Sequence, residues 1–176
     1  MRRRDFLQSV GSVTTVSFVG LAGCSSGNEG DTTPTDQPTG TTVNMLTDGG
    51  QYYFDPIGLA VDPGTTVTFR NENGSHSATA YQADNGYAST TRIPEGAEGF
   101  DSGTLTTEGE TYEHTFETEG TYDYFCIPHK TLGMVGRIVV GSPGGPAEGS
   151  MPPDGKVPTS DRIVDEKRVL YGDFTD

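Results

Sequence analysis

The chain has 176 residues, enough for one domain with accessory segments, and carries 11 Lys and Arg against 25 Asp and Glu, a formal net charge of −14. Glycine is abundant and tryptophan is absent, a composition that favours strands and turns. The acidity excludes nucleic acid as a partner, because binding to it depends on cations that neutralise phosphates.

Residues 1–23 predict an export signal. The chain opens with basic residues, and the apolar run at 10–22 is shorter than the ~20 residues of a membrane-spanning helix, which disfavours a transmembrane anchor. Residues 3–7 (RRDFL) resemble the twin-arginine signal, and residues 21–24 (LAGC) resemble a lipobox, in which the cysteine is lipidated. We therefore expect export, with a lipid on Cys24 anchoring the chain to the outer face of the cell membrane.

Residues 24–41 predict a flexible linker. Residues 25–42 include no large apolar side chain, so the segment cannot contribute to a core. A domain on this linker could rotate and search for partners near a membrane surface.

Residues 42–141 predict an all-β domain. Apolar and polar residues alternate at 65–70 (TTVTFR) and 112–117 (YEHTFE), and turn-forming pairs such as Asn73-Gly74 recur between such stretches. Many short strands with this spacing indicate a β-sandwich. Residues 81–100 lack alternation and are expected to form a long connection. A C-terminal extension, residues 142–176, follows, with a short helix expected after a Ser160 cap.

One loop between two predicted strands holds residues that suit copper. Residues 126–134 (CIPHKTLGM) offer the thiolate of Cys126, the imidazole of His129 and the thioether of Met134. Thiolate and thioether are soft ligands, and imidazole binds both Cu(II) and Cu(I). Each residue alone has an ordinary structural interpretation, but their spacing in one loop favours a metal site.

A blue-copper site needs a second histidine, because two His and one Cys form its trigonal plane, with Met as a weak axial ligand. His114 lies in mid-strand and is expected to be structural. His76 follows a turn at Asn73-Gly74-Ser75, where a loop end can project it toward the Cys126 loop. We therefore expect one mononuclear copper ion, with a second ligand imidazole from His76.

Residues 42–141 resemble the cupredoxin family, close to plastocyanins and halocyanins, in the Cys-x-x-His-x-x-x-x-Met spacing and in the segments around 109–112, 120–122 and 134–136. The resemblance implies a Greek-key β-sandwich of about eight strands, copper at one end, and one-electron transfer. Phe125 stands where plastocyanins usually have tyrosine, and Ser77 where they usually have asparagine. Ser77 is nevertheless expected to form a hydrogen bond to the Cys126 loop.

The predicted function is a blue-copper electron carrier that cycles between Cu(II) and Cu(I) and serves redox partner proteins at the membrane. His129 is expected to be the ligand nearest to solvent, flanked by Pro128 and Leu132, and to provide the exit for electrons. Lys130 would bias the choice of partner.

Other classes of protein fit less well. The chain has three histidines, too few for the additional copper centre of a multicopper oxidase or a copper nitrite reductase, so we do not expect an enzyme. A copper-binding or delivery protein without an electron-transfer role is the alternative, but it would favour exposed clusters of Cys or Met. A metal-free interaction module would have no need of all four ligand types.

Overall fold

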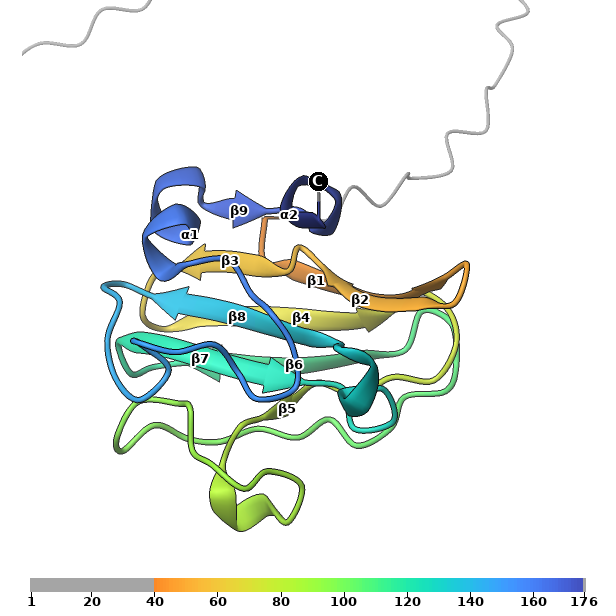
Figure 1. The fold of residues 1–176 in the computed structure, drawn as a ribbon, viewed down its shortest axis with the longest axis horizontal. Coiled ribbons are helices and arrows are strands. Elements are labelled where there is room, and N and C mark those ends of the chain that lie inside the picture. Colours follow the sequence, from red (N-terminus) through yellow and green to blue (C-terminus); the bar gives the residue numbers. More distant parts are fainter. Residues whose placement is uncertain (1–39, 176) are drawn as a thin grey trace, which may run out of the picture. The chain divides into compact units, whose positions relative to one another are not determined.

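The computed structural model describes residues 40–175, in which two β-sheets pack face to face (Figure 1). One sheet has the strand order β2-β1-β4-β6 and the other β5-β7-β8-β3-β9. The strands are β1 (Thr42–Asp48), β2 (Gln51–Asp55), β3 (Gly58–Val61), β4 (Thr65–Asn71), β5 (Thr79–Ala80), β6 (Thr111–Phe116), β7 (Gly120–Phe125), β8 (Val135–Val140) and β9 (Arg168–Val169).

The predicted all-β sandwich is confirmed. Strands β1 to β8 lie between residues 42 and 140, in agreement with the expected eight, and the C-terminal extension supplies a ninth. Strand β1 pairs with β4 in parallel, and β3 pairs with β8 in parallel, whereas the other pairs are antiparallel. Strands that follow one another in the chain, such as β2, β3 and β4, therefore often lie in different sheets, as in a Greek-key connection.

The core lies between the two sheets and is rich in aromatic residues. Val67 and Phe69, the apolar positions of the alternating stretch in β4, are both fully buried. Phe54 and Phe69 each contact the ring of Tyr124 edge-on, at centroid distances of 4.7 and 5.4 Å. Burial of such a side chain contributes roughly 1.5–3 kcal/mol, so these rings hold the sheets together and fix the strand ends that carry the site.

The long connection expected at 81–100 is present and contains only a short 3₁₀ helix, η1 (Ala83–Asn85). A second 3₁₀ helix, η2 (Lys130–Leu132), lies between β7 and β8. The extension adds α1 (Ser160–Glu166) and α2 (Tyr171–Thr175). Its strand β9 pairs with β3 at Gly58 and Leu59, and so closes that edge of the sheet.

The expected helix in the extension is present, but the cap assigned to Ser160 is wrong. The N-cap is Thr159, whose hydroxyl accepts a hydrogen bond from the Arg162 amide at 3.4 Å. Ser160 is the first helical residue, and its own hydroxyl instead donates to the carboxylate of Glu148. Two adjacent residues that both cap well cannot be told apart by a local pattern.

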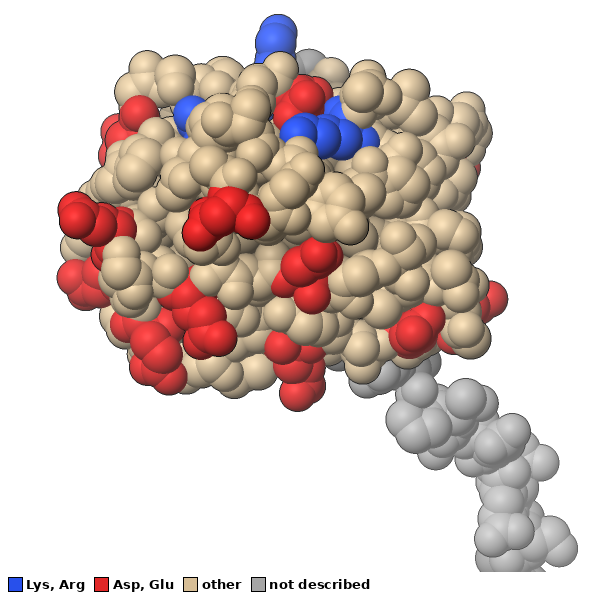
Figure 2. All heavy atoms as spheres, turned by 90° about the horizontal axis from the view of Figure 1, so that it is seen from below, with Lys and Arg blue, Asp and Glu red and all other residues tan. Residues whose placement is uncertain are grey.

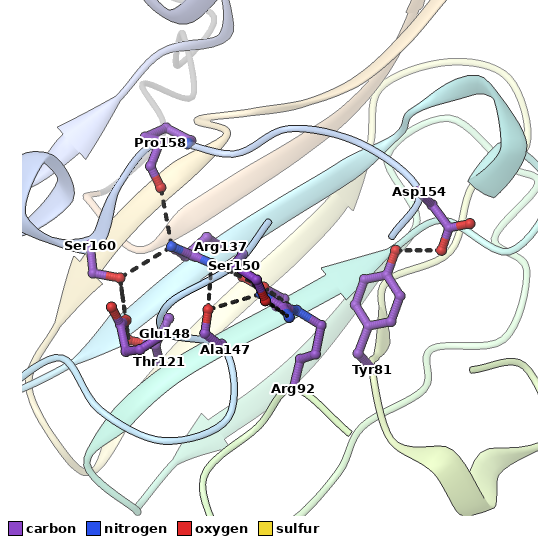
Figure 3. A network of polar contacts seen from close by, with 11 residues as sticks. Tyr81, Arg92, Thr121, Arg137, Ala147, Glu148, Ser150, Asp154, Pro158 and Ser160 are labelled. Atoms are coloured by element: carbon purple, nitrogen blue, oxygen red, sulfur yellow. Dashed lines mark hydrogen bonds and ion pairs between the residues drawn. The ribbon is translucent and has the colours of Figure 1, made fainter. Parts of the chain in front are cut away.

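The extension covers the outer face of β7 and β8, and all residues of these two strands are buried. Asp123 of β7 lies there between Arg92 and Arg137, with N–O distances of 2.8 and 2.7 Å. Both arginines also donate to the backbone oxygen of Ala147 in the extension (Figure 3). Buried charges need such compensation, and here it ties the extension to the sheet.

Among residues 40–175, no helix is long and apolar enough to cross a membrane. The expected export signal at 1–23, Cys24 and nearly all of the expected linker lie outside the described residues.

Candidate metal centre

Two segments bring the predicted ligands together at one end of the sandwich. Strand β5 pairs with β7 at Thr79 and Phe125, and His76 lies three residues before Thr79, close to Cys126. His76 is held further by two backbone hydrogen bonds with Leu105, of 3.0 and 2.7 Å. The loop from β7 to β8 supplies the other candidate ligands.

The donor atoms of three candidates already lie close together. The Sγ of Cys126 is 3.7 Å from Nδ1 of His76 and 3.4 Å from Nδ1 of His129. One donor atom from each residue lies within 4.8 Å of the other two. Two imidazole nitrogens and one thiol sulfur at this spacing fit the trigonal plane of a copper site.

Met134 is tied to the same place through its backbone. Its oxygen accepts a hydrogen bond from the Cys126 amide at 3.0 Å, and its amide donates to the oxygen of His129 at 3.3 Å. Its side chain is fully buried and belongs to the same apolar cluster as Cys126. The loop therefore holds the backbone of Met134 beside those of Cys126 and His129, where its buried thioether could serve as a further ligand.

A hydrogen bond from outside the site orients the ring of His76. Its Nε2 lies 3.0 Å from the Thr47 hydroxyl of β1, so Nδ1 is left to face the Cys126 sulfur. Fixing one ring nitrogen in this way selects the orientation and tautomer of a ligand imidazole. Thr47 was not identified from the sequence, because nothing in its local pattern marks it.

The expected hydrogen bond from Ser77 to the Cys126 loop is confirmed. The Ser77 hydroxyl accepts from the Ile127 amide at 2.8 Å. The Ser77 amide in turn donates to the Cys126 sulfur at 3.4 Å. Serine thus links the two segments that carry the candidate ligands.

Burial sets the protonation of the site. It lowers the pKa of His76 to about 4, assisted by the nearby His129, against a smaller opposing effect of the Asn73 backbone. It also raises the pKa of the Cys126 thiol, although hydrogen bonds from Ser77 and His129 act in the opposite direction. Near neutral pH the imidazole is therefore ready to bind metal, while the thiol loses its proton on binding.

His129 is the candidate ligand nearest to solvent. It is partly exposed, whereas the other three are buried. Pro128 and Leu132 beside it are exposed, Leu132 by 62%. Tyr52 of β2 stacks on its ring, with centroids 3.8 Å apart. A partner that approaches the exposed part of His129 therefore meets the apolar side chains of Pro128 and Leu132.

Lys130, which was expected to bias the choice of partner, makes several contacts within the protein. Its ammonium donates to the backbone oxygen of Tyr87, lies 3.5 Å from the Asp154 carboxylate, and stands over the Phe125 ring. Its side chain is 22% exposed. This lysine thus connects the metal-binding loop to the 81–100 connection, to β7 and to the C-terminal extension.

His114 is structural, as expected. Its ring contacts those of Phe100 and Phe116, at centroid distances of 4.8 and 4.7 Å. Within residues 40–175, the cluster of potential metal-binding groups includes the other two histidines and Cys126.

Comparisons with known proteins agree with this geometry. The family model "Copper binding proteins, plastocyanin/azurin family" matches residues 41–141. The halocyanin of Natronomonas pharaonis is 34% identical over 108 residues, 60% of this chain and 60% of its own length. The plastocyanin of Scenedesmus fuscus is 34% identical over 102 residues, 56% of this chain and 97% of its own.

Solved structures show the same fold. The pseudoazurin of Methylobacterium extorquens AM1 superposes with a TM-score of 0.50 and 26% sequence identity, over 72% of this chain and 95% of that one. The agreement in sequence and in fold groups the chain with copper-binding proteins and not with enzymes.

Proposed function

This chain belongs to the copper-binding plastocyanin/azurin family, the cupredoxins, and we propose that it is a one-electron carrier between redox partner proteins at a membrane. It binds one copper ion, for which we assign His76, Cys126, His129 and Met134 as ligands. The copper supplies the redox change between Cu(II) and Cu(I). The protein supplies the ligands, their fixed positions and the path to the surface.

The observation that carries the proposal is the preformed cluster of donors. Donor atoms of His76, Cys126 and His129 lie within 4.8 Å of one another, and all three residues are held by hydrogen bonds to their surroundings. A soft thiolate and thioether suit Cu(I), and imidazoles suit both states. Ligands that keep their positions between oxidation states keep the reorganisation small, and electron transfer is correspondingly fast.

Partner docking is proposed at the His129 end. His129 is partly exposed, and its exposed neighbours in the loop are Pro128 and Leu132. Apolar side chains permit close and transient contact with a partner. Acidic side chains are spread over the face of the molecule seen in Figure 2 and do not gather in one cluster there. We therefore assign the contact with the partner to these apolar neighbours of His129.

We also propose export and attachment to the outer face of the cell membrane by a lipid on Cys24. The proposal is supported by the sequence at residues 3–7 and 21–24. Mass spectrometry of the N-terminal peptide from the membrane fraction tests it: a lipid-modified Cys24 at the first position is expected. An unmodified Cys24 within a longer chain would contradict it.

Copper titration tests the metal assignment. On addition of Cu(II), the purified full chain should develop an intense thiolate-to-copper band in the visible spectrum. Cys126→Ser should abolish this band, and Cys24→Ser should leave it unchanged. A missing band in the natural protein, or a band that survives in Cys126→Ser, would contradict the assignment of Cys126 as a copper ligand.

Reversible voltammetry then separates a carrier from a delivery protein. A carrier should give a reversible one-electron wave and retain its copper through repeated cycles. A delivery protein should transfer the metal to a competing chelator within the same time. Full burial of Cys126 and Met134 favours retention.

A further inference from the structure

The C-terminal extension returns to the metal-binding loop after the last strand of the family match. Asp154 in the extension accepts a hydrogen bond of 2.7 Å from the Tyr81 hydroxyl (Figure 3). The same carboxylate oxygen lies 3.5 Å from the ammonium of Lys130. Because Lys130 follows His129 directly, Asp154 acts on the loop one residue from a candidate ligand.

Lys130 is enclosed on several sides, and Asp154 provides the compensating charge. Its ammonium donates to the Tyr87 backbone oxygen and stands 4.5 Å from the centroid of the Phe125 ring. A lysine in such a position loses hydration, and a carboxylate within 4 Å offsets that loss. Lys130 is held in place, and with it the start of η2.

The next residue of the extension packs against the other end of the loop. A Cβ atom on Gly155 would lie 2.7 Å from Cγ2 of Val135 and 3.0 Å from the oxygen of Gly133. Side chains larger than that of glycine would therefore push the extension away. Asp154 and Gly155 thus contact the loop on both sides of Leu132.

Both flanks of this contact are anchored. On one side, Arg92 donates to Ala147 and Ser150, and its own charge is balanced by Asp123. On the other side, Val157 is buried in one cluster with Phe125 and other residues. A segment fixed at both ends resists movement, and so it can restrain what it touches.

We infer that residues 153–157 act as a strut for the metal-binding loop, with Asp154 as a positioning residue that keeps His129 and Met134 in place. The strut deepens the proposed function, on which its consequence for electron transfer rests, because a carrier gains speed from ligands that do not move. Residues 153–157 should restrain the metal-binding loop in the copper-free protein as well.

Hydrogen exchange on the full copper-free chain tests the strut. The amides of Leu132, Gly133 and Met134 donate within the loop, at 3.0, 3.1 and 3.3 Å. In Asp154→Ala these amides should exchange about tenfold faster, the size expected for loss of one partly exposed charge-assisted contact. Exchange in β4 should stay unchanged. Copper loss to a chelator should accelerate several-fold in the loaded variant.

Two further variants define the cause. Asp154→Asn keeps an acceptor for Tyr81 but loses the charge that faces Lys130, and it should give an intermediate effect. Gly155→Ala should loosen the loop by pushing the extension away, without any change of charge. Glu166→Gln is the matched control, because it removes a charge from an exposed ion pair with Arg162 in the same extension.

The outcomes separate the strut from the proposed function. Loop exchange and copper loss in Asp154→Ala equal to those of Glu166→Gln would overturn the strut, whatever the redox behaviour of the protein. A wild-type protein without a reversible one-electron wave would overturn the carrier and leave the exchange result standing. If Asp154→Ala is too unstable to measure, the comparison of Asp154→Asn with Glu166→Gln decides.

Discussion

The ring of Tyr52 lies on the ring of His129, with centroids 3.8 Å apart and planes inclined by 14°. The same tyrosine meets the ring of His76 edge-on at 6.4 Å. It reaches this place because β2 pairs with β1 and sets Tyr52 opposite Thr47, which contacts His76. One hairpin thus supports both candidate imidazole ligands.

Tyr52→Ala should lower the reduction potential of the copper-loaded protein. Loss of the ring admits water beside His129, and water favours the more highly charged oxidised ion. The expected change is about 30 mV, equivalent to roughly 0.7 kcal/mol for a one-electron couple and of the size of one aromatic contact. Voltammetry measures it. Tyr52→Phe keeps the stacked ring, so its reduction potential should stay near that of the natural protein. Equal reduction potentials in Tyr52→Ala and Tyr52→Phe would contradict a role of the ring.

Asp123→Asn should destabilise the fold strongly. The substitution leaves two buried guanidinium groups, Arg92 and Arg137, without their shared counter-charge. Breaking such a buried pair costs about 3–5 kcal/mol in free energy of unfolding. Denaturant unfolding measures the loss. Glu166→Gln, in an exposed pair, should cost less than about 1 kcal/mol, and a similar loss in both variants would be inconsistent with the buried network.

Tyr124→Phe should raise the free energy of unfolding by about 1 kcal/mol. The Tyr124 hydroxyl is buried and has no hydrogen-bond partner among the described residues, so its removal relieves a desolvated group and keeps the ring contacts. Tyr122→Phe is the counterpart, because its hydroxyl donates to the Thr118 oxygen at 2.7 Å. It should lower the free energy of unfolding. Denaturant unfolding measures both changes. A less stable Tyr124→Phe together with a more stable Tyr122→Phe would contradict the prediction.

His114→Phe should weaken the acid sensitivity of the copper-free protein. Burial lowers the pKa of His114, against the opposing charge of Glu98, whereas an unfolded histidine has a pKa of about 6.5. Between these values the unfolded chain binds more protons, so stability is full above about 6.5 and falls as the pH drops through this range. Phenylalanine preserves packing with Phe100 but takes up no proton.

Urea unfolding at several pH values between about 7.5 and 5 checks this prediction. The variant should show a shallower fall in the free energy of unfolding than the natural protein. The fall should not vanish, because burial lowers the pKa values of His76 and His129 too. An unchanged slope would mean that His114 titrates alike in both states.

The sequence was most informative where the chemistry is local. Cys126, His129 and Met134 lie in one loop, and their donor types at this spacing predict three of the four candidate copper ligands. His76 needed a second argument, its place after a turn, which the pairing of β5 with β7 supports. The alternation in β4 predicts which residues enter the core, because strand side chains point to opposite faces in turn.

Contacts between distant segments could not be predicted in this way. Tyr52 meets His129, and Asp154 meets Lys130, only because the sheets and the extension fold over one another. Lys130 is charged and lies in a loop, features typical of a surface residue, so its enclosure was missed. Buried charges such as Asp123 are hidden for the same reason: their burial depends on a partner elsewhere in the chain.

Strand β9 also has a bearing on how copies of the chain meet one another. Without it, β3 would expose unpaired backbone groups along the edge of the five-stranded sheet, a template on which a second copy could add a strand. With it, that sheet ends in two-residue strands on both sides, β5 and β9. Such short edges give a second copy little backbone on which to add a strand to this sheet.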